Sequence, residues 1–315
     1  MRCTYKYCGA LHLQILRCAA PINITVRCTY KYNGALHLYC IKLKTKILLL
    51  TLLLASFSIK AQNPESEKVY QVNYKWEAPA TVVGYALNYY GLGLLKDKTR
   101  LDSTTILNLN RDKIWFFDRR AAFQKRDNYD NAQLISDIGM NVALALPALL
   151  AFDKQIRKDW LPVLFLYLET QAVGGHLYLW GGPMTHNRIR PFVYNPDFDM
   201  SMKLGGGTRD SFFSGHTSWT AGASFFTAKV YSDYHPELGN KKYWLFAAAV
   251  IPPVFVGYFR LRASKHFPTD ALTGLAIGAA TGILIPHLHK VNKKKNYTVI
   301  PFFGEYSGMA VSVDL

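Results

Sequence analysis

The chain has 315 residues, half of them hydrophobic and 14% aromatic, with a formal net charge of +16 at pH 7. This length allows one large or two small domains, with enough apolar material for a buried core. Residues 1–61 carry nine Lys and Arg and no acidic residue, so residues 62–315 hold an excess of only +7. That excess suits anionic substrates or a phospholipid surface and gives no reason to expect a nucleic-acid partner.

The amino-terminal segment repeats itself. The stretch RCTYKYCGALHL at 2–13 returns as RCTYKYNGALHL at 27–38, and all five cysteines fall within the first 40 residues. Two copies are too few to bury the core of a repeat protein. We therefore interpret residues 1–41 as an accessory leader, with a paired-cysteine or metal-binding leader as the alternative.

Residues 42–61 have the pattern of a secretory signal peptide. Three lysines precede an eleven-residue apolar run at 47–57, and Ala61–Gln62 offers a cleavage point. The run is too short for an ordinary membrane span, although an uncleaved anchor is an alternative. Either way, residue 62 is expected outside the cytoplasm of a bacterial cell, where the cysteine-free remainder needs no disulfide.

The remainder is predicted to be all-α. Residues 62–135 are expected to form an N-terminal segment with a surface helix at 78–95. Five further helices are predicted at 137–152, 160–181, 217–231, 243–259 and 270–288. Because no strand-like runs separate them, we expect a helical bundle over 136–289. Residues 290–315 are predicted to form a basic tail and a short hairpin.

Charged loops predict a topology. Basic residues gather at 152–159, 232–242 and 290–295. If all five helices span the membrane, these three segments lie on one side of it. Basic loops favour the cytoplasmic side. Segments 182–216 and 259–269 would then face the periplasm. Because residue 62 is already outside, the helix at 78–95 is expected to lie along the surface without crossing. We favour a bundle embedded in the inner membrane; a soluble periplasmic bundle is the alternative, since the helix at 217–231 is polar for a span.

The segment 259–269 carries a first set of reactive residues. Pro268 suits the first turn of a helix, which places His266 just before the helix and Asp270 in its first turn. A carboxylate within hydrogen-bonding reach of the imidazole would fix its tautomer and leave the other nitrogen free to attack; an ordinary capping Asp beside a loop His is the alternative. Arg260 and Arg262 could bind a phosphate or simply be solvated.

The segment 182–216 carries the second set. Ser214, Gly215 and His216 open a predicted helix, whose N-terminus favours an anion, and His216 could protonate a leaving oxygen. Arg188 and Arg190 would add positive charge, although each feature alone is typical of a turn or an exposed basic loop. Together, the two segments supply the charge stabilisation and positioning that phosphoryl transfer needs.

These residues, in this order, resemble the type-2 phosphatidic acid phosphatase and vanadium haloperoxidase superfamily. Its signature reads Lys-x6-Arg-Pro, then Pro-Ser-Gly-His, then Ser-Arg-x5-His-x3-Asp. The matching positions are Arg190-Pro191, Ser214-Gly215-His216 and Arg260-x5-His266-x3-Asp270. Three positions depart from the signature: Pro183 stands for the lysine, Phe213 for the second proline and Phe259 for the serine. Arg188 or Arg262 is expected to compensate for the missing lysine as an accessory residue.

The resemblance implies a bundle of the acid phosphatase and vanadium haloperoxidase type, and a phosphoric monoester hydrolase that works through a phosphohistidine without a metal. It implies that His266 attacks phosphorus, oriented by Asp270, while His216 protonates the leaving group and then activates water. The implied phosphate-binding residues are Arg190, Arg260, Ser214 and Gly215. A lipid phosphate monoester or pyrophosphate in a membrane is the expected substrate, and vanadate an inhibitor.

Three other functions stay open. The chain could be a soluble periplasmic acid phosphatase for small phosphomonoesters, a haloperoxidase with vanadate as its cofactor, or a binding module that lost activity with the motif lysine. No metal is expected, because the remaining histidines show no ligand spacing to carboxylates or cysteines. Those histidines are His176, His186, His235, His287 and His289, and the last two are interpreted as marking a helix end.

Overall fold

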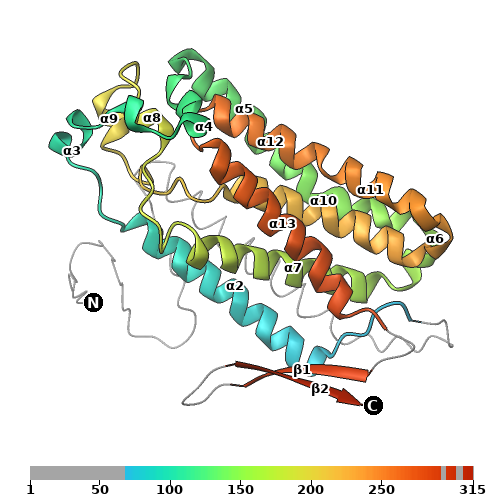
Figure 1. The fold of residues 1–315 in the computed structure, drawn as a ribbon. Coiled ribbons are helices and arrows are strands. Elements are labelled where there is room, and N and C mark those ends of the chain that lie inside the picture. The colour runs from blue at the N-terminus through green and yellow to red at the C-terminus, as the bar shows by residue number, and fades with distance from the viewer. Residues whose placement is uncertain (1–67, 292–295, 303–307, 315) are drawn as a thin grey trace, which may run out of the picture. The chain divides into compact units, whose positions relative to one another are not determined.

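The computed structural model describes residues 68–291, 296–302 and 308–314. The repeat, the five cysteines and the predicted signal segment therefore lie outside the described residues. The described chain belongs to one compact unit, a helical bundle (Figure 1), which confirms the all-α prediction. Its longer helices are α2 (Tyr74–Lys96), α5 (Tyr129–Leu144), α7 (Trp160–Gly181), α10 (Gly215–Tyr234), α11 (Lys242–Ala249), α12 (Ile251–Arg262) and α13 (Pro268–Leu288).

Short helices and 3-10 turns connect the long helices. The short helices are α3 (Ser103–Leu107), α4 (Phe116–Arg119), α6 (Lys154–Lys158), α8 (Pro191–Tyr194) and α9 (Met200–Lys203). The 3-10 turns are η2 (Arg111–Lys113), η3 (Arg120–Phe123), η4 (Arg126–Asn128), η5 (Leu146–Phe152) and η6 (Pro236–Lys241). Figure 1 shows α4, α8 and α9 at one end of the bundle and α6 at the other.

Prolines explain where helices differ from the prediction. The helix predicted at 137–152 begins at Tyr129 as α5 and gives way to the 3-10 turn η5, which has Pro147 in its first turn. The helix predicted at 243–259 divides into α11 and α12 just before Pro252 and Pro253. Proline lacks the N–H that the previous turn of an α-helix would bind, so it is accommodated in the first turn of a new helix.

The polar helix α10 is the centre of the bundle. It contacts α5, α7, α11, α12 and α13, and most of its residues are buried. Its closest neighbour is α13, where a Cβ atom added at Gly274, Gly278 or Gly282 would meet backbone oxygens of α10 or its N-cap at 2.4, 2.1 and 2.5 Å. Glycine at every fourth position therefore lets the two helices approach until their backbones touch. The polar composition of α10 is explained by its protein surroundings.

The helix at the amino-terminal end of the bundle differs from its prediction. Helix α2 begins at Tyr74 and packs lengthwise beside α7: Tyr85 Oη donates a hydrogen bond to Leu168 O at 2.9 Å, and Asn88 Nδ2 to Ala172 O at 2.9 Å. One turn later, Gly91 lies against Leu179. The helix expected on the surface therefore packs along α7 with one face, and of its residues only Thr81 and Gly91 are buried.

The two ends of the bundle carry different groups. We name the end near α6 the basic end. There, Tyr70 and Lys290 form an isolated antiparallel β-bridge, and Gln71 N donates a hydrogen bond to His289 O at 2.9 Å. At the opposite end, which we name the site end, Lys98 follows α2 and pairs with Asp210 at 2.9 Å. Helix α2 thus runs from the basic end to the site end.

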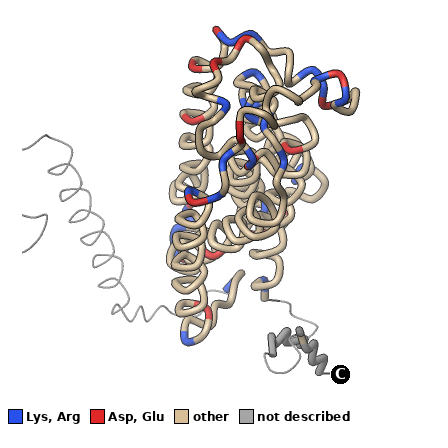
Figure 2. Tube along the Cα trace, turned by 90° about the vertical axis from the view of Figure 1, so that its left-hand side faces the viewer, with Lys and Arg blue, Asp and Glu red and all other residues tan. Residues whose placement is uncertain are grey.

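The outer surface of the bundle is apolar along its helices. Within the part of the chain that the structure describes, three helical stretches, 126–152, 236–262 and 268–288, are long and apolar enough to cross a membrane. Large side chains such as Val142, Trp244 and Tyr258 are more than half exposed. In Figure 2, many Lys, Arg, Asp and Glu positions lie in the connecting segments. Such a surface is typical of a protein that meets lipid.

The predicted carboxy-terminal hairpin is confirmed. Strands β1 (Asn296–Phe302) and β2 (Gly308–Asp314) pair antiparallel, with Asn296 opposite Asp314 and Phe302 opposite Gly308. The turn between them lies outside the described residues.

Candidate active site

Residues 263–267 of the motif segment 259–269 form the turn between α12 and α13. Ser264 has φ +51° and is buried, and its Oγ donates a hydrogen bond to Ala121 O at 2.8 Å. Its carbonyl accepts a hydrogen bond from Phe192 N at 3.0 Å. These contacts fix the turn so that the next residues, Lys265 and His266, face the loops of the site end.

His266 is held by a backbone carbonyl. Its Nδ1 lies 2.6 Å from Ser211 O, so Nδ1 carries the proton and Nε2 presents a lone pair. Arg190 Nη1 lies 3.5 Å from that Nε2. The imidazole is 2% exposed, and burial together with the charges of Arg190 and Arg260 lowers the pKa of His266 well below its usual value. The ring is therefore neutral and its free nitrogen can act as a nucleophile.

Asp270 does not bind the imidazole directly. Its Oδ2 lies 3.9 Å from His266 Nδ1, beyond hydrogen-bonding distance. The carboxylate instead accepts hydrogen bonds from Ser211 Oγ at 2.6 Å and Phe267 N at 2.9 Å, as well as from Arg188. The expected direct contact is therefore wrong: Asp270 positions Ser211, and Ser211 positions the ring. Ser211 is one of the site residues that the motifs do not indicate.

Arg188 is committed to two buried carboxylates. One guanidinium nitrogen donates to Asp270 and the other to Asp118, and these two carboxylates are 0% and 2% exposed. Asp118 also accepts from Thr269 N and Oγ1. The expectation that Arg188 replaces the motif lysine in binding phosphate is therefore wrong, because its charge is already neutralised. It joins α4 to the start of α13.

Arg190 and Arg260 keep most of their charge unpaired. Arg190 donates to two backbone carbonyls, Gly207 O at 2.7 Å and Lys265 O at 3.1 Å. Arg260 is 5% exposed, its Nε has no partner among the described residues, and its only close carboxylate is Asp137, at 3.7 Å. A buried guanidinium with free N–H groups is a binding site for an oxyanion.

Arg262 follows Arg260 by two positions on α12. Two residues correspond to about 200° around an α-helix, so Arg262 leaves the helix on nearly the opposite face. The structure does not support Arg262 as an accessory phosphate-binding residue.

His216 lies in the first turn of α10 and contacts a second unpredicted acid. Its Nε2 lies 2.8 Å from Asp137 Oδ1 on α5, which leaves Nδ1 available to a ligand. His216, Arg190 and Arg260 all lie close enough to His266 for their charges to lower its pKa. The predicted nucleophile, acid and two arginines are therefore brought to one end of the bundle.

The Ser214–Gly215 turn is fixed by its neighbours. Ser214 caps α10 through a hydrogen bond with Thr217, and its N–H donates to Asp270 O at 3.0 Å. A Cβ atom added at Gly215 would lie 2.9 Å from the ring of Tyr178, so only glycine fits here. The turn is thereby joined directly to the start of α13.

Two lysines lie at the site end. Lys98 Nζ donates to Pro183 O and pairs with Asp210 at 2.9 Å, so its charge is neutralised. Lys265 Nζ lies 4.7 Å from the centre of the Tyr129 ring and has no ion-pair partner among the described residues. Burial, Arg190 and Arg260 lower the pKa of Lys265 to about 7.

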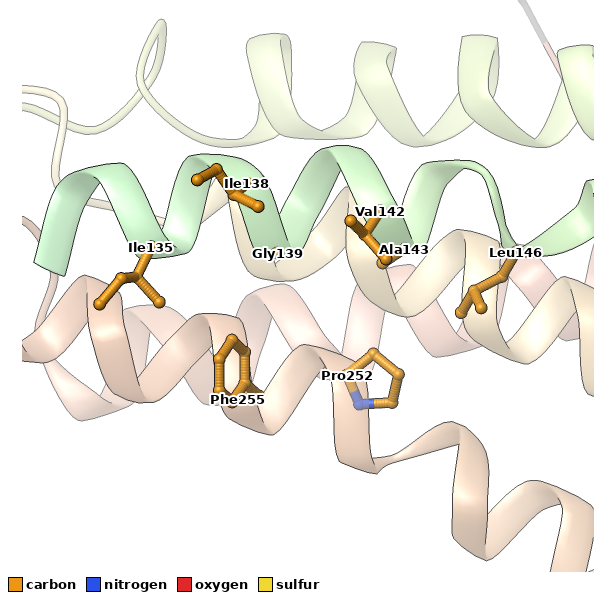
Figure 3. Close-up of a pocket in the computed structure, with 8 residues that line it drawn as sticks. All are labelled: Ile135, Ile138, Gly139, Val142, Ala143, Leu146, Pro252 and Phe255. Atoms are coloured by element: carbon orange, nitrogen blue, oxygen red, sulfur yellow. The ribbon is translucent and has the colours of Figure 1, made fainter.

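An apolar pocket begins beside Asp137, the partner of His216. Ile138 and Gly139, next to Asp137 on α5, and Pro252 and Phe255 on α12 line a pocket of about 380 Å³ that continues along α5 to Leu146 (Figure 3). The lining is almost entirely hydrocarbon, so the pocket suits an aliphatic chain.

One comparison with known proteins, that with family models, agrees with these motifs. Residues 159–294 match the PAP2 superfamily. Among solved structures, the chain is similar to a transmembrane PAP2-type phosphatidylglycerolphosphate phosphatase from Bacillus subtilis, at 19% identity with a TM-score of 0.38, covering 66% of this chain and 94% of that one. No curated protein matches the chain.

Proposed function

We propose that this protein, whose residues 159–294 match the PAP2 superfamily, is a membrane phosphatase that hydrolyses a lipid phosphate monoester through a phosphohistidine on His266. One observation carries the proposal: the free Nε2 of a neutral imidazole lies 3.5 Å from Arg190, and the charge of the buried Arg260, whose Nε has no partner among the described residues, acts on the same ring. A nucleophile beside buried positive charge suits attack on a phosphoryl group.

In the proposed first step, His266 Nε2 forms a bond to phosphorus as the bond from phosphorus to the lipid oxygen breaks. The guanidinium groups of Arg190 and Arg260 stabilise the charge on the phosphoryl oxygens, together with the start of α10. The Nδ1 proton stays on the ring, and its hydrogen bond to Ser211 O stabilises the positive charge that the imidazole gains. His216, paired with Asp137, gives a proton to the leaving oxygen.

In the second step, His216 accepts a proton from a water molecule whose oxygen attacks phosphorus. The bond between phosphorus and His266 Nε2 breaks, and inorganic phosphate leaves. The residues supply nucleophile, acid, base and charge stabilisation, so we propose that the reaction needs no metal.

The apolar pocket favours a lipid over a small phosphomonoester. It starts beside Asp137, the partner of His216, and extends away between α5 and α12. A headgroup phosphate bound at the arginines would leave an acyl chain free to enter the pocket. The variant Val142→Trp, which fills the pocket, tests whether the pocket binds the acyl chain. The matched control is Val83→Trp on the exposed face of α2. Only the first variant should raise KM for long-chain phosphatidate, and neither should change hydrolysis of p-nitrophenyl phosphate.

The central experiment compares wild type with His266→Ala in detergent micelles that contain phosphatidate, with release of inorganic phosphate as the readout. We expect wild-type activity that resists a chelator and is inhibited by vanadate, and a loss of at least about a thousandfold in the variant. His176→Ala, an exposed histidine on α7, is the control and should retain activity. Activity that survives in His266→Ala, or that requires added metal, contradicts the mechanism.

A further inference from the structure

We propose that Glu77, Glu169 and His289 form a divalent metal site, of a kind suited to Zn²⁺, that joins α2, α7 and α13 near the basic end. His289 Nε2 lies 3.4 Å from Glu77 Oε2 and 3.6 Å from Glu169 Oε2, and the three ligand atoms lie within 4.8 Å of one another. The site lies away from Arg190 and Arg260 and is independent of the proposed phosphatase function. The three residues come from distant parts of the chain, so their spacing in the sequence does not indicate the cluster.

The orientation of the His289 ring points to a cation between the three side chains. Nδ1 lies 2.8 Å from Ile285 O and donates its proton there, so Nε2 faces both carboxylates. A metal-binding histidine is typically oriented in this way, by a hydrogen bond from its other nitrogen to a carbonyl. A protonated Nε2 would offer one N–H to two carboxylates and could bind only one of them well.

One oxygen of each carboxylate lacks a hydrogen-bond donor. Glu77 Oε2 and Glu169 Oε2 are both buried atoms that accept no hydrogen bond from any described residue. The side chains of Glu77, Glu169 and His289 are 25%, 19% and 14% exposed. Buried carboxylate oxygens without a donor are costly unless a cation neutralises them. The partial exposure leaves room for a water ligand.

A second histidine of the same bundle provides a comparison. His235 Nδ1 lies 2.6 Å from Glu237 and its Nε2 lies 3.0 Å from Asp153, so each nitrogen has its own carboxylate at the distance of a charge-assisted hydrogen bond. At His289 both carboxylates face one nitrogen and stand farther away. Ligands bound to tetrahedral Zn²⁺ at about 2.0–2.1 Å lie about 3.3 Å apart, which agrees with the spacing at His289.

The donor set indicates the type of metal. One imidazole nitrogen and two carboxylate oxygens suit Zn²⁺ better than Mg²⁺ or Ca²⁺, which prefer oxygen ligands alone. The site is adjacent to the hydrogen bond from Gln71 N to His289 O. A bound ion would therefore fasten α2 to the end of α13, and we assign it a structural role.

The test measures zinc in the full chain, with all thiols blocked by N-ethylmaleimide so that the leader cysteines do not bind it. After loading and dialysis, elemental analysis should find one more equivalent of zinc in wild type than in Glu169→Gln or His289→Gln. Added Zn²⁺ should raise the Tm of wild type by about 5 °C and leave the Tm of both variants unchanged, and Mg²⁺ should have no effect. The control His235→Gln should bind zinc as wild type does.

Equal zinc content in wild type and both variants, with no shift in Tm, would show that the cluster is an ion pair around a protonated His289 and would overturn the proposal. Phosphatidate hydrolysis should be the same with and without zinc. A metal requirement for hydrolysis would count against the proposed reaction mechanism, whereas the zinc content decides the site.

Discussion

At the scale of single residues, the candidate nucleophile depends on a contact that has no sequence signature. His266 is oriented by the carbonyl oxygen of Ser211, and Asp270 acts only through the Ser211 hydroxyl. A carbonyl oxygen is present at every residue, so no motif could indicate this one. The residue types of the motifs were informative about chemistry, but not about which atom holds the ring.

The bridge formed by Arg188 gives a stability prediction. Replacing Arg188 by Met leaves the carboxylates of Asp118 and Asp270 buried without their cation, which should cost about 3–5 kcal/mol. The control is Arg126→Met, because Arg126 pairs with an exposed Asp130 and such pairs contribute less than about 1 kcal/mol. Thermal unfolding of both variants measures the difference. Equal losses would mean that Arg188 does not stabilise the two acids.

Lys265 gives a prediction about pH. Its pKa of about 7 means that its ammonium is present below pH 7 and lost above it. Affinity for an anionic substrate should therefore fall as pH rises through 7, by about fivefold if the charge contributes roughly 1 kcal/mol. The measurement is KM for phosphatidate between pH 6 and 8.5. Lys265→Arg keeps its charge throughout and should remove this part of the change; an unaltered profile would exclude Lys265 from binding.

At the scale of elements, close packing of α10 and α13 is what brings the two motif segments together. The glycines of α13 allow the contact, and Ser214 N then reaches Asp270 O. The sequence predicted both helices from their apolar runs, but α10 looked too polar for a span. The position of α10 among other helices explains that composition, because small and polar side chains suit a helix surrounded by protein.

Gly278 tests this packing. Its Cβ position lies 2.1 Å from Ser218 O, so Gly278→Ala should separate the helices, lower stability by about 1–3 kcal/mol and reduce phosphatase activity. The control Gly93→Ala lies in α2, where nothing approaches within 4 Å, and should be neutral or stabilise by up to about 1 kcal/mol. Thermal unfolding and phosphate release report both effects. Gly278→Ala that behaves like Gly93→Ala would refute the packing argument.

Loops were less predictable than helices. The order of the predicted helices correctly indicated that residues 182–216 and 259–269 share one end, but the partners Asp118 and Asp137 come from α4 and α5, far away in the chain. Neither acid has a spacing that links it to a motif. Their roles depend on how the helices pack, and helical periodicity alone does not specify that packing.

At the scale of the whole molecule, α2 changes the topology argument. It runs the length of the bundle, so residue 70 lies at the same end as the basic loops at 152–159 and 232–242. If the bundle spans a membrane, the chain before α2 and these loops share one side. The predicted export of residue 62 and the predicted cytoplasmic position of the basic loops therefore cannot both hold for an embedded bundle.

Labelling of single cysteines decides between these arrangements. In a variant whose five native cysteines are replaced by serine, Gly206→Cys reports the site end and Lys241→Cys the basic end. We expect a membrane-impermeant maleimide to label the first in intact spheroplasts and the second only after lysis, because basic loops stay in the cytoplasm. Labelling of both in intact spheroplasts, or in the supernatant, would indicate a soluble periplasmic protein.

The bridge between Tyr70 and Lys290 has a practical consequence for engineering. Because the polypeptide enters and leaves the bundle at adjacent backbone positions, a short flexible peptide could connect them and close the chain into a ring. New termini could then be opened at the exposed Gly239. Such a circular permutant should keep Arg190 and Arg260 in place.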